Sequence, residues 1–196
     1  MKLVIQKWGV ALLLTAYSLI AAQAGSPSSS KVDSLYQRVL AIADENPQEA
    51  SRLANLCRQE SSKSGNSRDK ALSLMANAQA LIAMSLWNNA SEKIDSASLF
   101  VQKLNDLNLE ADLVDLRSNL EVKVSGSDAA LKMLQKAYSQ AIKSKRPDLG
   151  VKFLLLQAGL YQQKGNLAEA NRMREIALDQ SSKAGCKKCQ AECQQN

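Results

Sequence analysis

Apolar residues recur at steps of three and four positions along almost the whole chain from Lys31 onward. This spacing places them on one side of an α-helix, and no stretch shows the strict alternation that is typical of a half-buried β-strand. Only three prolines occur in the chain, and the glycines fall mostly between the periodic segments. The pattern therefore predicts an all-α protein.

Short polar turns separate the periodic segments and set the boundaries of eight predicted helices. Asn46-Pro47 is typical of a helix start, because Asn is a good N-cap and Pro suits the first helical position. A second break falls at 64–67 and a third at Asn88-Asn89, and Ser127 is placed to cap the sixth helix. Helices joined by such short loops pack antiparallel to their neighbours. The predicted helices are 32–44, one from Pro47 to the break at 64, 68–87, 90–104, 107–122, and three that begin near Ser127, Pro147 and Asn166.

The last predicted hairpin has the residue spacing of a known helical repeat. Positions 4, 8, 11, 15, 20 and 27 of a repeat unit are occupied by Leu154, Ala158, Tyr161, Gly165, Ala170 and Ala177. With its small residues at 8, 20 and 27, its aromatic at 11 and its glycine at 15, this hairpin resembles the tetratricopeptide repeat. That repeat is a helix pair of about 34 residues in which small residues allow the two helices to approach closely.

The resemblance implies antiparallel helix hairpins stacked as a short tetratricopeptide-like α-solenoid of about eight helices over residues 31–183. Two features depart from the pattern: Arg174 stands where a large residue is usual, and the closing proline is missing. Counting backwards from Ala170, the equivalent residues are Ala130, Ile94 and Ala50, at intervals of 40, 36 and 44. The alternative is a plain helical bundle in which one hairpin matches by chance.

Repeats of this kind present the inner faces of their first helices as a concave binding surface. The groove-facing positions that the resemblance implies in the last hairpin suit a polar or acidic peptide, and the alternative is that they are solvated helix surface. They are Lys152, Leu155, Gly159, Gln162 and Gln163.

Residues 1–24 have the features of a cleavable secretory signal. Lys2 and Lys7 precede an apolar run over 8–22, and Ala22-Gln23-Ala24 matches the cleavage pattern. The run is short for a bilayer span, although an uncleaved anchor is the alternative. Residues 25–30 are then a disordered lead-in. We expect an exported, soluble mature chain in a bacterial periplasm or secreted.

Charge is distributed unevenly over the mature chain. Residues 25–122 hold 13 acidic and 10 basic side chains, whereas residues 123–196 hold 6 acidic and 13 basic ones. Such a gradient attracts an acidic partner, or weakly an anionic membrane surface, to the C-terminal half. Nucleic acid is not expected as a partner, because few aromatics lie among the basic residues and no nucleic-acid motif is present.

The chain contains no histidine, which removes the commonest general base and the most frequent metal ligand. Neither a nucleophile elbow nor a phosphate-binding glycine loop is present. Asp112 and Asp115 lie among polar neighbours and are expected to be solvated. The sequence therefore favours a protein that is not an enzyme and needs no cofactor.

Three cysteines lie in the tail formed by residues 184–196, namely Cys186, Cys189 and Cys193. In an oxidising compartment two of them are expected to pair, as Cys189–Cys193 or Cys186–Cys189. A three-thiolate metal site is the alternative, and the odd thiol leaves a disulfide-linked dimer open. Cys57, on the apolar side of the second helix, is expected to be a buried thiol.

These observations predict an exported scaffold that binds a protein or peptide partner without catalysis. Two alternatives are an extracytoplasmic sensory module that acts through a separate membrane partner, and a metal or redox role of the cysteine tail.

Overall fold

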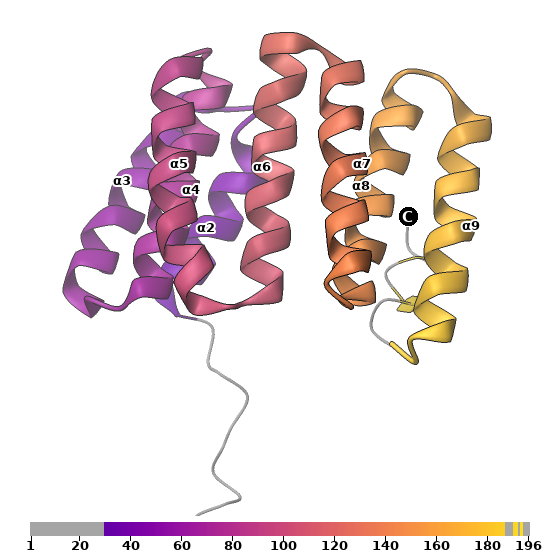
Figure 1. The fold of residues 1–196 in the computed structure, drawn as a ribbon. Coiled ribbons are helices and arrows are strands. Elements are labelled where there is room, and N and C mark those ends of the chain that lie inside the picture. The colour runs from indigo at the N-terminus through magenta and orange to yellow at the C-terminus, as the bar shows by residue number, and fades with distance from the viewer. Residues whose placement is uncertain (1–29, 187–189, 192, 194–196) are drawn as a thin grey trace, which may run out of the picture. The chain divides into compact units, whose positions relative to one another are not determined.

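The computed structural model describes residues 30–186, 190, 191 and 193. Eight helices occupy residues 31–183, and the described residues contain no strand, so the all-α prediction is confirmed (Figure 1). The helices are α2 (Lys31–Ile42), α3 (Pro47–Ser64), α4 (Ser67–Ala83), α5 (Trp87–Leu104), α6 (Leu107–Ser125), α7 (Ser127–Lys143), α8 (Pro147–Gln163) and α9 (Leu167–Lys183).

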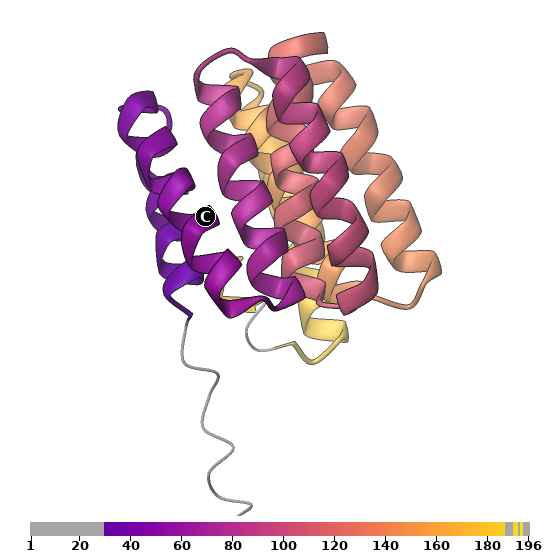
Figure 2. The ribbon, with the colours of Figure 1, turned by 90° about the vertical axis from the view of Figure 1, so that its left-hand side faces the viewer.

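Each helix packs against the next one in the chain, which gives four hairpins: α2–α3, α4–α5, α6–α7 and α8–α9. The first helices of successive hairpins also contact each other, as α2 with α4, α4 with α6 and α6 with α8. Within the described part of the chain, the backbones of successive second helices do not approach one another closely, although side chains of α7 and α9 meet: the Gln180 Nε2 donates to the Tyr138 hydroxyl. This pattern is that of an α-solenoid built from stacked helix hairpins (Figures 1 and 2).

The hairpins repeat at a constant interval along the chain. The second helices begin at Pro47, Trp87, Ser127 and Leu167, so the residue number rises by 40 from each start to the next. The first helices α4, α6 and α8, which begin at 67, 107 and 147, show the same interval, which we call the hairpin period. The fourth residue of every second helix is a fully buried alanine: Ala50, Ala90, Ala130 and Ala170. Ala90 therefore occupies the position that the sequence pattern assigned to Ile94, and the unequal intervals of 36 and 44 were wrong.

The turns between hairpins follow the hairpin period. Gly65, Asn105, Lys145 and Gly185 are equivalent positions, and all four have a left-handed backbone with φ between 50° and 68°. Glycine adopts this conformation at no steric cost, whereas Asn and Lys adopt it less readily. The period is hard to find in the sequence because only two of the four positions carry glycine.

The third helix ends earlier than predicted. α4 stops at Ala83, Ser85 adopts φ 60°, and the Leu86 amide donates to the Leu81 carbonyl at 2.9 Å, which closes the helix. The predicted break at Asn88-Asn89 was wrong, because both residues lie in the first turn of α5. The apolar pattern continues through the exposed residues of the true turn and so hides it.

The N-terminal caps agree with the prediction at one helix and differ at another. Asn46 caps α3, with its Oδ1 accepting from the Glu49 amide at 3.1 Å, and Pro47 is the first helical residue, as predicted. Ser127 is itself the first residue of α7; Gly126 precedes it, and no side chain of the described residues caps this helix. The predicted role of Ser127 was wrong.

Replacing Asn46 with alanine is expected to lower the free energy of unfolding by about 1 kcal/mol, because the Glu49 amide loses its acceptor. Thermal or urea unfolding followed by helical circular dichroism measures this loss. Asn89→Ala, at an exposed helical position without a cap role, is the control and should change stability by less than about 0.5 kcal/mol. Equal losses in the two variants would show that the cap does not contribute.

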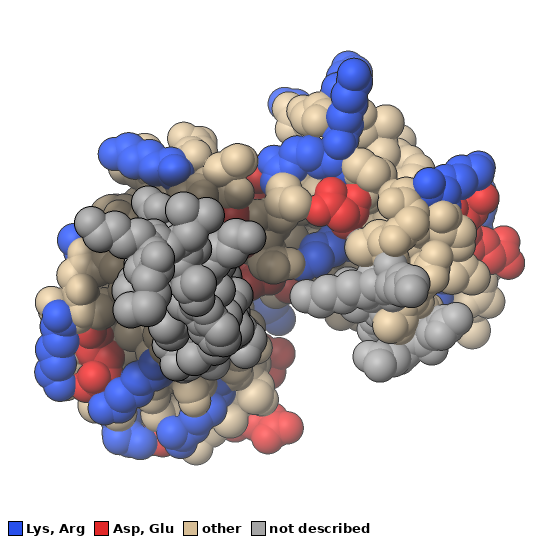
Figure 3. Space-filling model, turned by 90° about the horizontal axis from the view of Figure 1, so that it is seen from below, with Lys and Arg blue, Asp and Glu red and all other residues tan. Residues whose placement is uncertain are grey.

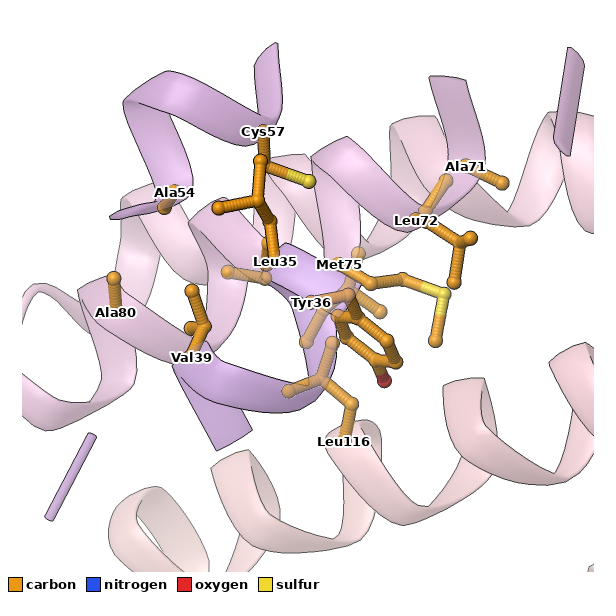
Figure 4. Packing of buried hydrophobic residues seen from close by; sticks show 14 of the residues in the cluster. Leu35, Tyr36, Val39, Ala54, Cys57, Ala71, Leu72, Met75, Ala80 and Leu116 are labelled. Carbon is orange, nitrogen blue, oxygen red and sulfur yellow. The ribbon is translucent and has the colours of Figure 1, made fainter. Parts of the chain in front are cut away.

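The largest apolar cluster joins α2, α3, α4, α5 and α6. Tyr36, Leu72 and Met75 lie at its centre and are at most 1 % exposed (Figure 4). Cys57 is fully buried in the same cluster, its Sγ lies 3.7 Å from the Val32 carbonyl oxygen, and burial raises the pKa of the thiol to about 12. The predicted buried thiol is confirmed.

The predicted signal at 1–24 lies outside the described residues, as does the lead-in except for Ser30. None of the helices in the described part of the chain is long and apolar enough to cross a bilayer.

Candidate binding surface

The hairpin period identifies equivalent positions on the first helices of the hairpins. One such row contains Val32, Leu72, Asp112 and Lys152, and another contains Leu35, Met75, Asp115 and Leu155. The α2 and α4 members of both rows are apolar and buried. The α6 and α8 members are only partly buried, and three of these four are charged. The inner face of the solenoid is therefore closed by core packing over α2 and α4 and open over α6 and α8.

A pocket of about 250 Å³ lies between α6 and α8 at these positions, and we call it the hollow. Figure 3 shows that the surface is hollowed between the N-terminal helices and the C-terminal helices, with acidic and basic side chains on its walls. The side chains that line the hollow combine two carboxylates, one ammonium group and an apolar wall. They are Ala111, Asp112, Asp115, Lys152, Leu155 and Leu156.

The two carboxylates of the hollow are desolvated. Burial raises the pKa of Asp115 to about 6, and the neighbouring charge of Asp112 adds to the effect. Burial also raises the pKa of Asp112, although the Lys152 ammonium acts in the opposite direction. Neither carboxylate forms a hydrogen bond or a close ion pair with another residue in the described part of the chain. The expectation that both are solvated was wrong, because side chains of α8, among them Leu155 and Leu156, enclose this face of α6.

The cations near the hollow already have partners. Arg68 at the start of α4 pairs with Asp33 of α2 at 3.2 Å and with Asp106, the N-cap of α6, at 3.5 Å. Lys152 donates to Asn108 Oδ1 at 2.8 Å. These contacts hold the rim of the hollow together, and they leave the two carboxylates on α6 without a close cation among the described residues.

The five predicted groove residues occupy different surroundings. Lys152 and Leu155 line the hollow, and an added Cβ at Gly159 would meet no atom within 4 Å. Gln162 is exposed and accepts a hydrogen bond from Arg174 of α9, and Gln163 is exposed at the end of α8. The structure thus brings two of the five together with the acid pair, which sequence reasoning missed. A binding role for any of them stays a prediction.

The start of the cysteine tail folds back on the last hairpin. Cys186 and Cys193 pack against the buried cluster that includes Val151 and Met173. Cys189 lies outside the described residues, so both predicted disulfides and the three-thiolate site stay predictions. Among the described residues, no group of three or more Cys, Asp or Glu side chains is arranged to hold a metal ion.

Comparison of the chain with protein-family models, with curated proteins and with solved structures finds no match.

Proposed function

We propose that this protein is a non-enzymatic binding module that holds a basic segment of a protein partner in the hollow between α6 and α8. The observation that carries the proposal is the Asp112–Asp115 pair, two desolvated carboxylates without a close cation among the described residues. Keeping two such charges together costs free energy in the unbound protein. A bound Lys or Arg side chain would remove part of that cost by forming charge-assisted hydrogen bonds.

The apolar part of the hollow supports a peptide ligand. Leu155 and Leu156 of α8 lie beside the carboxylates, so one wall offers apolar contact while the other offers charge. A Lys or Arg side chain matches this arrangement because its aliphatic stem packs on apolar surface while its head group remains polar. The expected ligand is therefore an extended segment with a basic residue next to an apolar one.

The net charge of the C-terminal half led to the expectation of an acidic partner, whereas the hollow itself favours a basic one. Its own cations are engaged: Lys152 bonds to Asn108, and Arg68 pairs with Asp33 and Asp106. An acidic segment in the hollow would face the two carboxylates instead. The basic residues of 123–196 create a positive electrostatic field around the C-terminal half of the chain. Such a field changes the rate of association with a partner more than it changes which ligand fits the hollow.

Three further parts of the proposal rest on sequence patterns. We propose tetratricopeptide-like hairpins, which the buried Ala158, Ala170 and Ala177 support. The hairpin period modifies this likeness, because the typical repeat is shorter, at about 34 residues. Export to the periplasm or the extracellular space rests on the signal features of 1–24. A disulfide within the tail, or between two copies, rests on the cysteine count and on an oxidising compartment.

The proposal is tested by selecting binders from a random peptide library displayed on phage, with sequencing of the enriched peptides. Enrichment of Lys or Arg beside an apolar residue is expected. The Asp112→Asn/Asp115→Asn double variant should bind a selected peptide about 10- to 100-fold more weakly, since charge-assisted hydrogen bonds are lost.

Asp95→Asn/Asp179→Asn removes two exposed carboxylates from the second helices and serves as the charge-matched control. This control should keep the affinity within about twofold, apart from a weak salt-dependent effect. Failure to enrich any peptide with a basic residue, or enriched basic peptides that bind both double variants equally, would contradict the proposal.

A further inference from the structure

A second and larger groove lies on the other side of α8, between α7 and α9. It has a volume of about 570 Å³, which falls in the range of ligand-binding pockets. The groove lies where α7 and α9 both pack on α8 while their backbones stay apart, and the Gln180 Nε2 of α9 donates to the Tyr138 hydroxyl of α7. Leu154, Gln157 and Tyr161 of α8 form its floor. At about 100° per residue these three positions lie roughly opposite Leu155 and Lys152, so this groove is separate from the hollow.

The walls of the groove are mainly apolar. Leu131 and Tyr138 come from α7, and Met173 and Ile176 come from α9. Two acidic and two basic side chains line the groove, namely Asp128, Glu169, Lys132 and Arg172. Both acids are paired, Asp128 with Lys164 and Glu169 with Arg172 at 3.2 Å. Because the charges of the lining balance and both acids already have cationic partners, the rim gives little preference to a charged ligand. The surroundings therefore favour a neutral occupant with apolar side chains.

One polar side chain interrupts this apolar floor. Gln157 is only 7 % exposed, and its buried Nε2 has no hydrogen-bond partner among the described residues. Leaving a buried amide without partners is unfavourable, so such groups are normally paired in folded proteins. A side-chain amide carries both a donor and an acceptor, and the peptide group carries the complementary pair. Gln157 is thus suited to pair with the backbone of a bound peptide.

The two earlier repeats show what the same position does elsewhere in the solenoid. Asn77, two hairpin periods before Gln157, donates to the Ala54 carbonyl of α3 at 3.3 Å. Arg117, one period before it, pairs with Asp95 of α5 at 2.8 Å. In both repeats the polar side chain joins the first helix to the second helix of the preceding hairpin. The Gln157 Nε2 makes no such bond to α7, so its hydrogen-bonding capacity is unused within the described chain.

We propose that the groove between α7 and α9 is a second peptide-binding site, which takes a neutral extended segment with one apolar side chain in the groove. The peptide group next to that side chain pairs with the Gln157 amide. The site differs from the hollow in its ligand, because the hollow selects a basic residue and this groove selects an uncharged one. It does not depend on the function proposed for the hollow.

The smallest probe with these features is N-acetyl-leucine methylamide, an apolar side chain between two peptide groups. Titrated into the ¹⁵N-labelled protein, it is expected to shift amide resonances of α7, α8 and α9 that border the groove, with a dissociation constant in the millimolar range, about what a ligand of this size achieves. N-acetylglycine methylamide lacks the apolar side chain and should bind at least about tenfold more weakly.

Gln157→Leu keeps the volume of the side chain and removes the amide, so it should weaken probe binding about tenfold. Gln163→Leu places the same change on the exposed end of α8 and should leave binding unchanged. Asp112→Asn/Asp115→Asn should also have no effect, which separates this site from the hollow. Absence of shifts in the wild-type protein, equal binding by Gln157→Leu, or shifts confined to the hollow would each overturn the proposal.

Discussion

Replacing Tyr36 with alanine is expected to lower the free energy of unfolding by about 3–5 kcal/mol, the range for a large aromatic removed from a core. Tyr36 is 1 % exposed and lies next to Met75 of α4 and Leu116 of α6 (Figure 4). It therefore connects three first helices rather than two. Its loss would leave a cavity where α2 closes the inner face of the solenoid. Urea unfolding followed by helical circular dichroism measures the change.

Two controls separate packing from other effects. Tyr36→Phe keeps the ring and should cost less than about 1 kcal/mol, since only the hydroxyl is removed. Leu99→Ala truncates an apolar side chain that is 61 % exposed and should change stability by less than about 0.5 kcal/mol. A loss below about 1 kcal/mol for Tyr36→Ala would mean that α2 does not pack on α4 and α6 as described.

Replacing Asp115 with asparagine is expected to stabilise the protein at neutral and alkaline pH. The pKa of Asp115 is raised to about 6 in the folded state, above the value near 4 of an unfolded aspartate. The folded state therefore favours the protonated carboxyl, and ionisation costs stability. This cost is absent below pH 4, grows between pH 4 and 6 and is complete above pH 6. Asparagine, which does not ionise, avoids it.

The expected gain for Asp115→Asn is about 2–3 kcal/mol at pH 8 and close to zero at pH 4. Free energies of unfolding measured by urea at several pH values between 4 and 8 give the profile. Asp179→Asn is the control, because Asp179 is 58 % exposed and pairs with Lys183, so its removal should not stabilise the protein at any pH. A gain for Asp115→Asn that did not vary with pH would show that Asp115 is solvated.

These two residues differ in how far the sequence determines their role. Tyr36 lies on the apolar side of a strongly periodic helix, so its burial follows from the pattern. Asp115 is an acidic residue among polar neighbours on its helix, and a carboxylate in such a stretch is usually solvated. Its desolvation depends on the placement of α8 beside α6, which encloses the carboxylate in the hollow and is a property of two successive hairpins together.

The hairpin period is likewise determined in part by the sequence and in part by the tertiary structure. The sequence pattern identifies Ala50, Ala130 and Ala170 as equivalent residues but assigns the fourth position to Ile94, whereas the structure places Ala90 there. The exposed apolar residues Met84, Leu86 and Trp87 continue the helical periodicity through a turn that Ser85 closes with a left-handed backbone. Once the helix boundaries are known, the constant interval between hairpins is evident.

The sequence by itself determined the all-α class, the number of helices between residues 31 and 183, their antiparallel pairing and the burial of Cys57. These features depend on periodicity, N-caps and short turns, which are local. The tertiary structure alone decided that the inner face is open only over α6 and α8, that Asp112 and Asp115 are desolvated there, and that Gln157 lacks the bond made by its equivalents. These features arise from contacts between hairpins, and the spacing of residues within one helix carries no information about how the next hairpin is placed.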